Sequence, residues 1–261
     1  MGKGHSLLKV FSAIGLALTL VMSLSANAGL FGIGGNTMGW KEEVLLHDGQ
    51  KVLAERFYNL GGHAVIESRE RAALDQTVTF NLPGTNQKIT WKTDLRDTEP
   101  EPNSLNLLLI GVVKGVPYIA TYPAGCIAYN KWKRPNPPYV LFKYEGNEWK
   151  RISLAEFPAE LSKTNVIIGR PATSLLKPFY TADQVNAENH DVRQPEYKTI
   201  LREPMVNAGG NCGEMIPTKD GGWTGIGWFK KQPSLEACLN YCKRENVAPQ
   251  SCPCEKLFEG K

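Results

Sequence analysis

Six cysteines are the residues of this 261-residue chain that are most able to do chemistry: Cys126, Cys212, Cys238, Cys242, Cys252 and Cys254. Four of them crowd into the stretches "CLNYC" and "CPC" near the C-terminus. Thiolates at such short spacings could bind zinc, exchange with other thiols, or pair as structural disulfides. The compartment in which the chain folds helps to decide among these chemistries, because structural disulfides persist mainly in oxidising surroundings.

The first 28 residues have the pattern of a cleavable export signal. Lys3 and Lys9 make a positive n-region, residues 10–24 carry no charge, and residues 26–28 read Ala-Asn-Ala, which a signal peptidase accepts. The apolar run is shorter than the roughly 20 residues of a membrane-spanning helix. We therefore expect a signal peptide at 1–28, cleavage after it, and a periplasmic or secreted protein without a stable membrane anchor.

An even number of cysteines in an exported chain favours three structural disulfides over zinc binding or redox activity. Two leucines and two cysteines have the i, i+3, i+4, i+7 spacing of one helical face: Leu235, Cys238, Leu239 and Cys242. A helix that begins after Ser234, its expected N-cap, would therefore place both thiols on one face. Both thiols then need partners from another segment.

That segment is Cys252-Pro253-Cys254, because a bond within Cys-Pro-Cys would close a strained ring. We expect Cys238 and Cys242 to pair with Cys252 and Cys254, in an order that spacing leaves open. Cys126 then remains for Cys212.

Histidines and carboxylates indicate no catalytic constellation by their spacing. After the signal there are three histidines, which we expect to be solvated or locally hydrogen-bonded: His47, His63 and His190. One group of carboxylates could supply the acid–base pair of a glycosidase, although charged turn residues are the commoner case: Glu145, Glu148 and Glu156. The chain has no G-x-S-x-G elbow, H-E-x-x-H helix or P-loop. We predict no catalytic residue, no metal site and no cofactor.

Residues 129–152, "YNKWKRPNPPYVLFKYEGNEWKRI", combine six aromatic residues with six Lys or Arg. Such a mixture suits stacking on sugars or bases beside neutralised phosphates. Strand periodicity places Val140, Phe142 and Tyr144 on one face, so at least part of this aromatic set should pack into a core. The remaining candidate binding residues belong to a proline-stiffened loop and its end: Trp132, Lys133, Arg134 and Tyr139.

The overall charge excludes no partner class but favours none. Residues 1–28 hold two of the 30 Lys and Arg and none of the 26 Asp and Glu, which leaves 28 basic against 26 acidic side chains. A nucleic-acid-binding domain usually shows a strong basic excess or stripe, so no nucleic acid is expected as a partner.

Four strand–turn–strand patterns follow one another between residues 40 and 152. Asp48-Gly49, Pro83-Gly84, Lys114-Gly115 and Glu145-Gly146-Asn147 mark the turns. The first arm of the third pair, "SLNLLLIGVV", is apolar enough for a strand buried on both faces, and Pro117 favours an edge position for the second arm. We predict a mainly β, antiparallel fold, either a sandwich, an open barrel or propeller-like blades.

The resulting organisation has five parts. A signal peptide (1–28) and a flexible Gly-rich lead (29–39) precede an antiparallel β domain (40–160). An irregular connecting segment (161–205) leads to a disulfide-stapled, Cys-rich appendage (206–261) with one short helix.

The stretches "LPGTNQKITWK" and "YNKWKRPNPPYVLFKYEGNEWKRISLAEFPAE" resemble those of uncharacterised exported proteins of Gram-negative bacteria. The resemblance covers about residues 40–170 and the ending "CPCEKLF", and it implies an envelope location without an assigned activity. The leading hypothesis is a non-enzymatic exported β-protein that binds an envelope protein or glycan. An envelope hydrolase acting on glycan or peptide is the alternative, and polyanion binding is a weaker one.

Overall fold

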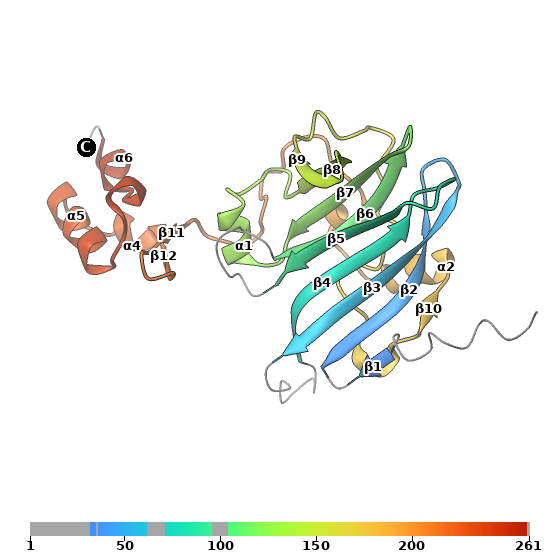
Figure 1. Cartoon of the computed structure of the whole chain (residues 1–261). Helices are drawn as coiled ribbons and strands as arrows, with labels where there is room; N and C mark the ends of the chain where they lie inside the picture. Colours follow the sequence, from blue (N-terminus) through green and yellow to red (C-terminus); the bar gives the residue numbers. More distant parts are fainter. Residues whose placement is uncertain (1–31, 35, 62–70, 96–103, 260–261) are drawn as a thin grey trace, which may run out of the picture.

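The structure is a computed structural model that describes residues 32–34, 36–61, 71–95 and 104–259 (Figure 1). The expected signal peptide and His63 lie outside the described residues. Strands predominate over helices in this part of the chain, as the mainly β prediction requires. No helix within it is long and apolar enough to cross a membrane.

Eight strands form the four predicted antiparallel hairpins: β2 (Thr37–Leu45) with β3 (Lys51–Gly61), β4 (Ala72–Asn81) with β5 (Lys88–Asp94), β6 (Leu105–Val113) with β7 (Val116–Pro123), and β8 (Val140–Glu145) with β9 (Glu148–Ile152). The turn residues do what their chemistry predicts. Gly84 has φ of 72°, and the N–H of Thr85 donates to the carbonyl of Leu82, as in a type II turn.

The strands build two sheets that face each other across one core. The first sheet has the order β1-β2-β3-β4-β5, where β1 is Gly32–Gly34, and the short β10 (Phe179–Tyr180) pairs parallel to β2. The second has the order β6-β7-β8-β9. Both contribute buried side chains to a shared cluster that includes Val44, Phe80 and Trp91 from the first sheet and Leu107, Ile110 and Ile119 from the second. The architecture is therefore a sandwich.

The described part of the Gly-rich lead belongs to this sandwich. Gly32–Gly34 pair with the start of β2, which itself begins at Thr37, so these stretches of the expected flexible lead are strand. Backbone hydrogen bonds to a strand edge need no side chains, which explains why the composition of the lead did not indicate a strand.

Side chains also bridge the edges of the two sheets. The amide of Asn165 accepts from the N–H of Ile110 (3.0 Å), and it donates to the carbonyls of Ile110 (2.8 Å) and Leu45 (3.0 Å). It therefore acts as a substitute strand partner for β6 while also holding the end of β2. The indole of Trp149 on β9 donates to the carbonyl of Thr90 on β5 (2.8 Å).

The position of β7 corrects one expectation, because this strand lies inside its sheet, between β6 and β8. Pro117 is tolerated there since the pairing with β8 extends only from Tyr118 to Thr121. The residue without an N–H therefore lies beyond the end of that ladder. The neighbouring β6 is buried on both faces, as its apolar sequence predicts.

The segment 161–205 covers the sandwich, and it contains β10 and several short helices: η1 (Thr173–Leu175), α2 (Ala182–Glu188) and α3 (Pro195–Lys198). Leu161 and Ile200 pack on the outer face of the second sheet. Gly111 on β6 leaves room for Leu161, whose side chain would lie 2.6 Å from an added Cβ. Ile167 and Val185 cover part of the first sheet beside Trp40.

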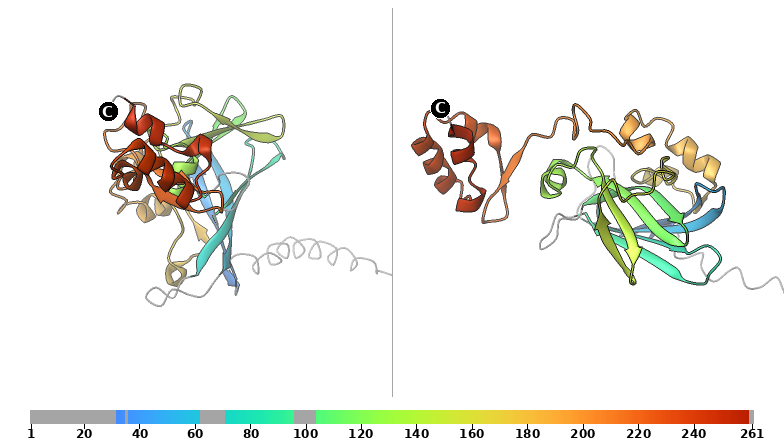
Figure 2. Two further views of the ribbon diagram at one scale, coloured as in Figure 1. Left: turned by 90° about the vertical axis from the view of Figure 1, so that its left-hand side faces the viewer. Right: turned by 90° about the horizontal axis from the view of Figure 1, so that it is seen from above.

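The chain ends in a separate unit, called the C-terminal module below (residues 215–258), and it consists of β11 (Met215–Pro217), β12 (Trp223–Gly225), α4 (Ile226–Lys230), α5 (Leu235–Arg244), η2 (Pro249–Ser251) and α6 (Cys254–Phe258). Figures 1 and 2 show this module away from the sandwich, at the end of a connecting segment that we call the tether (residues 203–214). The predicted helix is α5, capped by the Ser234 hydroxyl, and α4 and α6 accompany it.

Candidate functional site

All six cysteines are paired as Cys126–Cys212, Cys238–Cys254 and Cys242–Cys252. The predicted partner sets are therefore confirmed, and the structure supplies the order within the module. Three disulfides are typical of a protein that folds outside the reducing cytoplasm.

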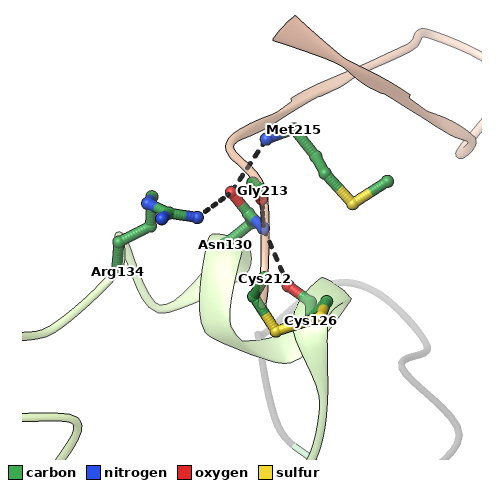
Figure 3. Close-up of a disulfide and its surroundings, with 6 residues drawn as sticks. All are labelled: Cys126, Asn130, Arg134, Cys212, Gly213 and Met215. Atoms are coloured by element: carbon green, nitrogen blue, oxygen red, sulfur yellow. Dashed lines mark hydrogen bonds between the residues drawn. A yellow bond between two sulfur atoms is a disulfide. The ribbon is translucent and has the colours of Figure 1, made fainter. Parts of the chain in front are cut away.

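The first of these disulfides joins the tether to α1 (Cys126–Lys131), the short helix after β7. Asn130 of α1 strengthens this attachment (Figure 3). Its amide nitrogen donates to the carbonyls of Cys126 (2.8 Å) and Gly213 (3.0 Å), while its oxygen accepts from the N–H of Met215 (2.9 Å). One side chain of α1 thus holds the last part of the tether at Gly213 and the first residue of the module, Met215.

Further contacts hold the tether to residues 129–136. The amide of Asn136 exchanges two hydrogen bonds with the backbone of Met205, at 2.9 and 2.7 Å. Gly209 lies directly against the ring of Tyr129, where an added Cβ would overlap the ring. The guanidinium of Arg134 covers that ring at 4.9 Å from its centroid. The first part of the aromatic–basic stretch, at Tyr129, Asn130 and Asn136, is therefore in contact with the protein's own tether.

Trp132 is half-buried against the shared core. Its ring meets Phe142 edge-on at 6.3 Å between centroids, and the guanidinium of Arg151 lies 5.1 Å from its centroid. Arg134 is likewise half-buried, and only Lys133 among these three candidates is exposed. The three residues are thus not an open stacking platform.

Tyr139 is only 5% exposed, so it does not contribute to a surface site. Its hydroxyl lies 2.8 Å from the carbonyl of Glu196 and 3.0 Å from that of Thr199, and it accepts from the N–H of Leu201 (3.1 Å). Burial raises the pKa of this hydroxyl to about 12. Tyr139 therefore anchors the segment that covers the second sheet.

Two of the three candidate carboxylates near the aromatic stretch, Glu145 and Glu156, have a lowered pKa. Glu145 accepts from the ammonium of Lys143 at 3.0 Å, and this contact lowers its pKa. The backbone N–H and hydroxyl of Ser153 lower the pKa of Glu156 in the same way. A general acid needs the opposite shift, so these environments do not favour the glycosidase alternative.

Of the other polar candidates, His47 is exposed beside its turn. His190 is exposed too, with its Nδ1 3.0 Å from a carboxylate oxygen of Asp191. Neither histidine is brought next to a nucleophile or a metal-ligand set among the described residues.

The largest exposed aromatic side chain among the described residues is Trp228 of α4, which is 57% exposed. The ammonium of Lys231 lies 4.6 Å from its ring centroid. On α5, Leu235 and Leu239 are 41% and 37% exposed, one helical turn apart. Their spacing places them on one helical face with Cys238 and Cys242, yet of these four residues only the two cysteines are buried. The sequence therefore missed these three exposed apolar residues of α4 and α5, which we call the module face (Trp228, Leu235 and Leu239).

Comparisons of the chain with protein-family models, with curated proteins and with solved structures found no match. The function must therefore be inferred from the residues of this chain alone.

Proposed function

We propose that this chain is an exported, non-catalytic binding protein whose sandwich presents the C-terminal module to a protein of the bacterial envelope. Three features support an exported location: the signal-like residues 1–28, the three disulfides, and the resemblance to exported proteins of Gram-negative bacteria. The mature protein is then periplasmic or secreted.

The exposure of Trp228 is the observation that carries the proposal. Trp is the residue type that most often dominates binding energy at protein interfaces, where it fills a pocket on the partner. The module has its own core, and an indole stabilises a fold mainly when it is buried there. An exposed indole contributes little to the stability of the module. The adjacent Lys231 keeps one side of the ring polar and soluble.

The composition of the module face favours a protein partner over a glycan. Sugars stack on aromatic rings, and Trp228 alone would suit both ligands. Leu235 and Leu239 add an aliphatic strip on α5. Such a strip gains free energy from the apolar surface of a protein and gains little from a hydroxyl-rich glycan.

The attachment of the module also suits binding. Its tether is held by the Cys126–Cys212 disulfide and by Asn130, so less freedom is lost when a partner is engaged. A module on a free linker would lose more.

The test compares affinity capture from envelope extract by the mature protein and by two variants, each of which lacks one exposed aromatic side chain. Trp228→Ala should weaken binding of the captured partner, identified and then titrated as a purified protein, by about 30-fold or more, which is the effect of a hot-spot residue. Phe179→Ala, which removes a 41% exposed aromatic ring from the sandwich, is the matched control and should retain affinity. Equal affinity of wild type and Trp228→Ala would contradict the proposal. Trp228-dependent sedimentation with purified peptidoglycan would instead assign the face to a glycan.

A further inference from the structure

The two disulfides of the C-terminal module lie in contact with each other. Cys242 is bonded to Cys252 and Cys238 to Cys254, yet the sulfurs of Cys242 and Cys254 are only 3.5 Å apart. The sulfurs of Cys242, Cys252 and Cys254 all lie within 4.8 Å of one another. A sulfur of one disulfide is therefore already next to a sulfur of the other.

The different exposure of the four cysteines determines which of the two disulfides an external thiol can attack first. Cys238 and Cys254 are 0% exposed and Cys242 is 4% exposed, whereas Cys252 is partly exposed. An external thiol can thus reach the module best at the sulfur of Cys252. Attack at that sulfur makes Cys242 the leaving thiolate, and Cys242 is the residue that faces Cys254.

We infer that the C-terminal module is a thiol–disulfide exchange unit that accepts an external thiol at Cys252 and transfers the exchange to the buried Cys238–Cys254 bond. The inference is independent of the module face and of any partner bound there. The external reactant is a thiol such as glutathione or an exported protein dithiol.

The exchange proceeds in two balanced steps. In the first, the external thiolate, whose proton has gone to water, bonds to the sulfur of Cys252, and the Cys242–Cys252 bond breaks with its electron pair on Cys242. In the second, the Cys242 thiolate bonds to the sulfur of Cys254, and Cys238 leaves as a thiolate that takes a proton from water. The products are a mixed disulfide at Cys252, a Cys242–Cys254 disulfide and a thiol at Cys238.

The products keep the module stapled. The new Cys242–Cys254 bond still joins α5 to α6, so a covalent link between the two helices persists on either side of the exchange. The freed thiol lies on the inner face of α5, in the cluster that contains Phe229 and Tyr241. The electrons therefore end on a residue shielded from solvent.

The test treats the full exported protein with limiting reduced glutathione and quenches it with acid. The quenched protein is unfolded in denaturant so that buried thiols become accessible, and its free thiols are labelled with N-ethylmaleimide. The remaining disulfides are then reduced and labelled with a second reagent, and tandem mass spectrometry locates each label. We expect glutathione on Cys252, the first label on Cys238 and none on Cys242. The first label on Cys242, with the Cys238–Cys254 bond intact, overturns the inference. The Cys126–Cys212 pair provides an internal reference in the same digest.

A variant tests the second step without an external thiol. Cys252→Ser leaves the Cys242 thiol next to Cys254, so the Cys238–Cys254 bond should be lost in favour of Cys242–Cys254, with the first label on Cys238. Cys212→Ser is the matched control and should place the first label on Cys126 alone. In Cys252→Ser, a first label that stays on Cys242, or that scatters over the remaining cysteines, counts against exchange directed by the native geometry.

Discussion

The guanidinium Nη1 of Arg56 on β3 lies 2.9 Å from Oε1 of Glu42 on β2, and both side chains are 0% exposed. The other carboxylate oxygen accepts from the indole of Trp40 (2.9 Å) and from the N–H of Ile167 (3.3 Å). Arg56 also donates to the carbonyls of Ile167 (3.1 Å) and Gly169 (3.0 Å). The ion pair therefore ties the covering segment to the inner face of the first sheet.

Removal of one member of this pair should be strongly destabilising, because the other charge is left buried without compensation. We expect Arg56→Met to reduce the free energy of unfolding by about 3–5 kcal/mol, measured by urea denaturation. Lys51→Met is the control, since the Lys51–Glu43 pair has the same 2.9 Å separation but is partly exposed. It should cost at most about 1 kcal/mol. Equal losses in the two variants would show that burial is not what makes Arg56 important.

Asn165 should stabilise the fold through the hydrogen bonds of its amide group and not through the volume of its side chain. Asn165→Leu removes three hydrogen bonds and leaves the N–H and carbonyl of Ile110 without that partner, so we expect a loss of about 2–4 kcal/mol of stability. Asn165→Asp retains an acceptor for the Ile110 N–H and should be less damaging. The control Asn59→Leu removes an exposed contact to Asp75 and should change stability by about 0.5 kcal/mol or less. Stability of Asn165→Leu equal to wild type would refute the bridging role.

Substitution of two adjacent glycines in the tether, Gly209 and Gly210, distinguishes the cost of backbone strain from the cost of a steric clash. Gly209 and Gly210 have φ of 78° and 56°, so alanine at either position costs about 1–2 kcal/mol through the backbone alone. Only at Gly209 would the new Cβ also overlap the ring of Tyr129. We expect Gly209→Ala to accelerate thermolysin cleavage at residues 203–214 more than Gly210→Ala does. The reverse order would mean that the tether does not lie on Tyr129.

Asn130 should hold the tether even while the Cys126–Cys212 disulfide is intact. Asn130→Ala removes its hydrogen bonds to Gly213 and Met215, worth about 1–3 kcal/mol together. Cleavage of the tether by thermolysin should then become at least about fivefold faster, since it tracks local opening. Asn59→Ala should leave the rate unchanged. A rate unaffected by Asn130→Ala would assign the attachment to the disulfide alone.

Buried tyrosines should make the fold sensitive to alkaline pH. Burial raises the pKa of both Tyr139 and Tyr122 to about 12, above the value of about 10 expected in the unfolded chain. The folded state thus favours the neutral phenol, and this contribution is complete below about pH 10 and is lost as pH rises through about 12. Urea unfolding at increasing pH should show the loss, and Tyr139→Phe should show a smaller one. A pH-independent stability across this range would contradict the assigned burial.

Local patterns predicted the hairpins because strand pairing between neighbours depends on short-range signals. The period-2 alternation and the turn residues, such as Pro83-Gly84, act over a few residues. The assignment of Val140, Phe142 and Tyr144 to one face followed from the same alternation, and all three contact the shared core. The partner sets of the cysteines also followed, because helical spacing places Cys238 and Cys242 together.

The candidate site was harder to predict, since exposure depends on what else packs nearby. Trp132 and Tyr139 looked available in a basic, proline-rich stretch, but the core and the covering segment occupy them. Leu235 and Leu239 share a helical pattern with Cys238 and Cys242, but the core of the small module contains the cysteines and leaves both leucines exposed. The exposure of these side chains depends on distant parts of the chain, so a local sequence pattern does not predict it.

By itself, then, the sequence determined the β hairpins, the three-disulfide chemistry and the export-like N-terminus, because each of these depends on residue types at short spacing. Tertiary structure alone decided how the sheets face each other, how the two neighbouring disulfides are arranged, and where the tether lies. These depend on contacts such as Asn165 with Leu45 and Arg56 with Ile167, which join residues 120 and 111 positions apart. Contacts of that range form only when the whole chain is packed, so no local pattern predicts them.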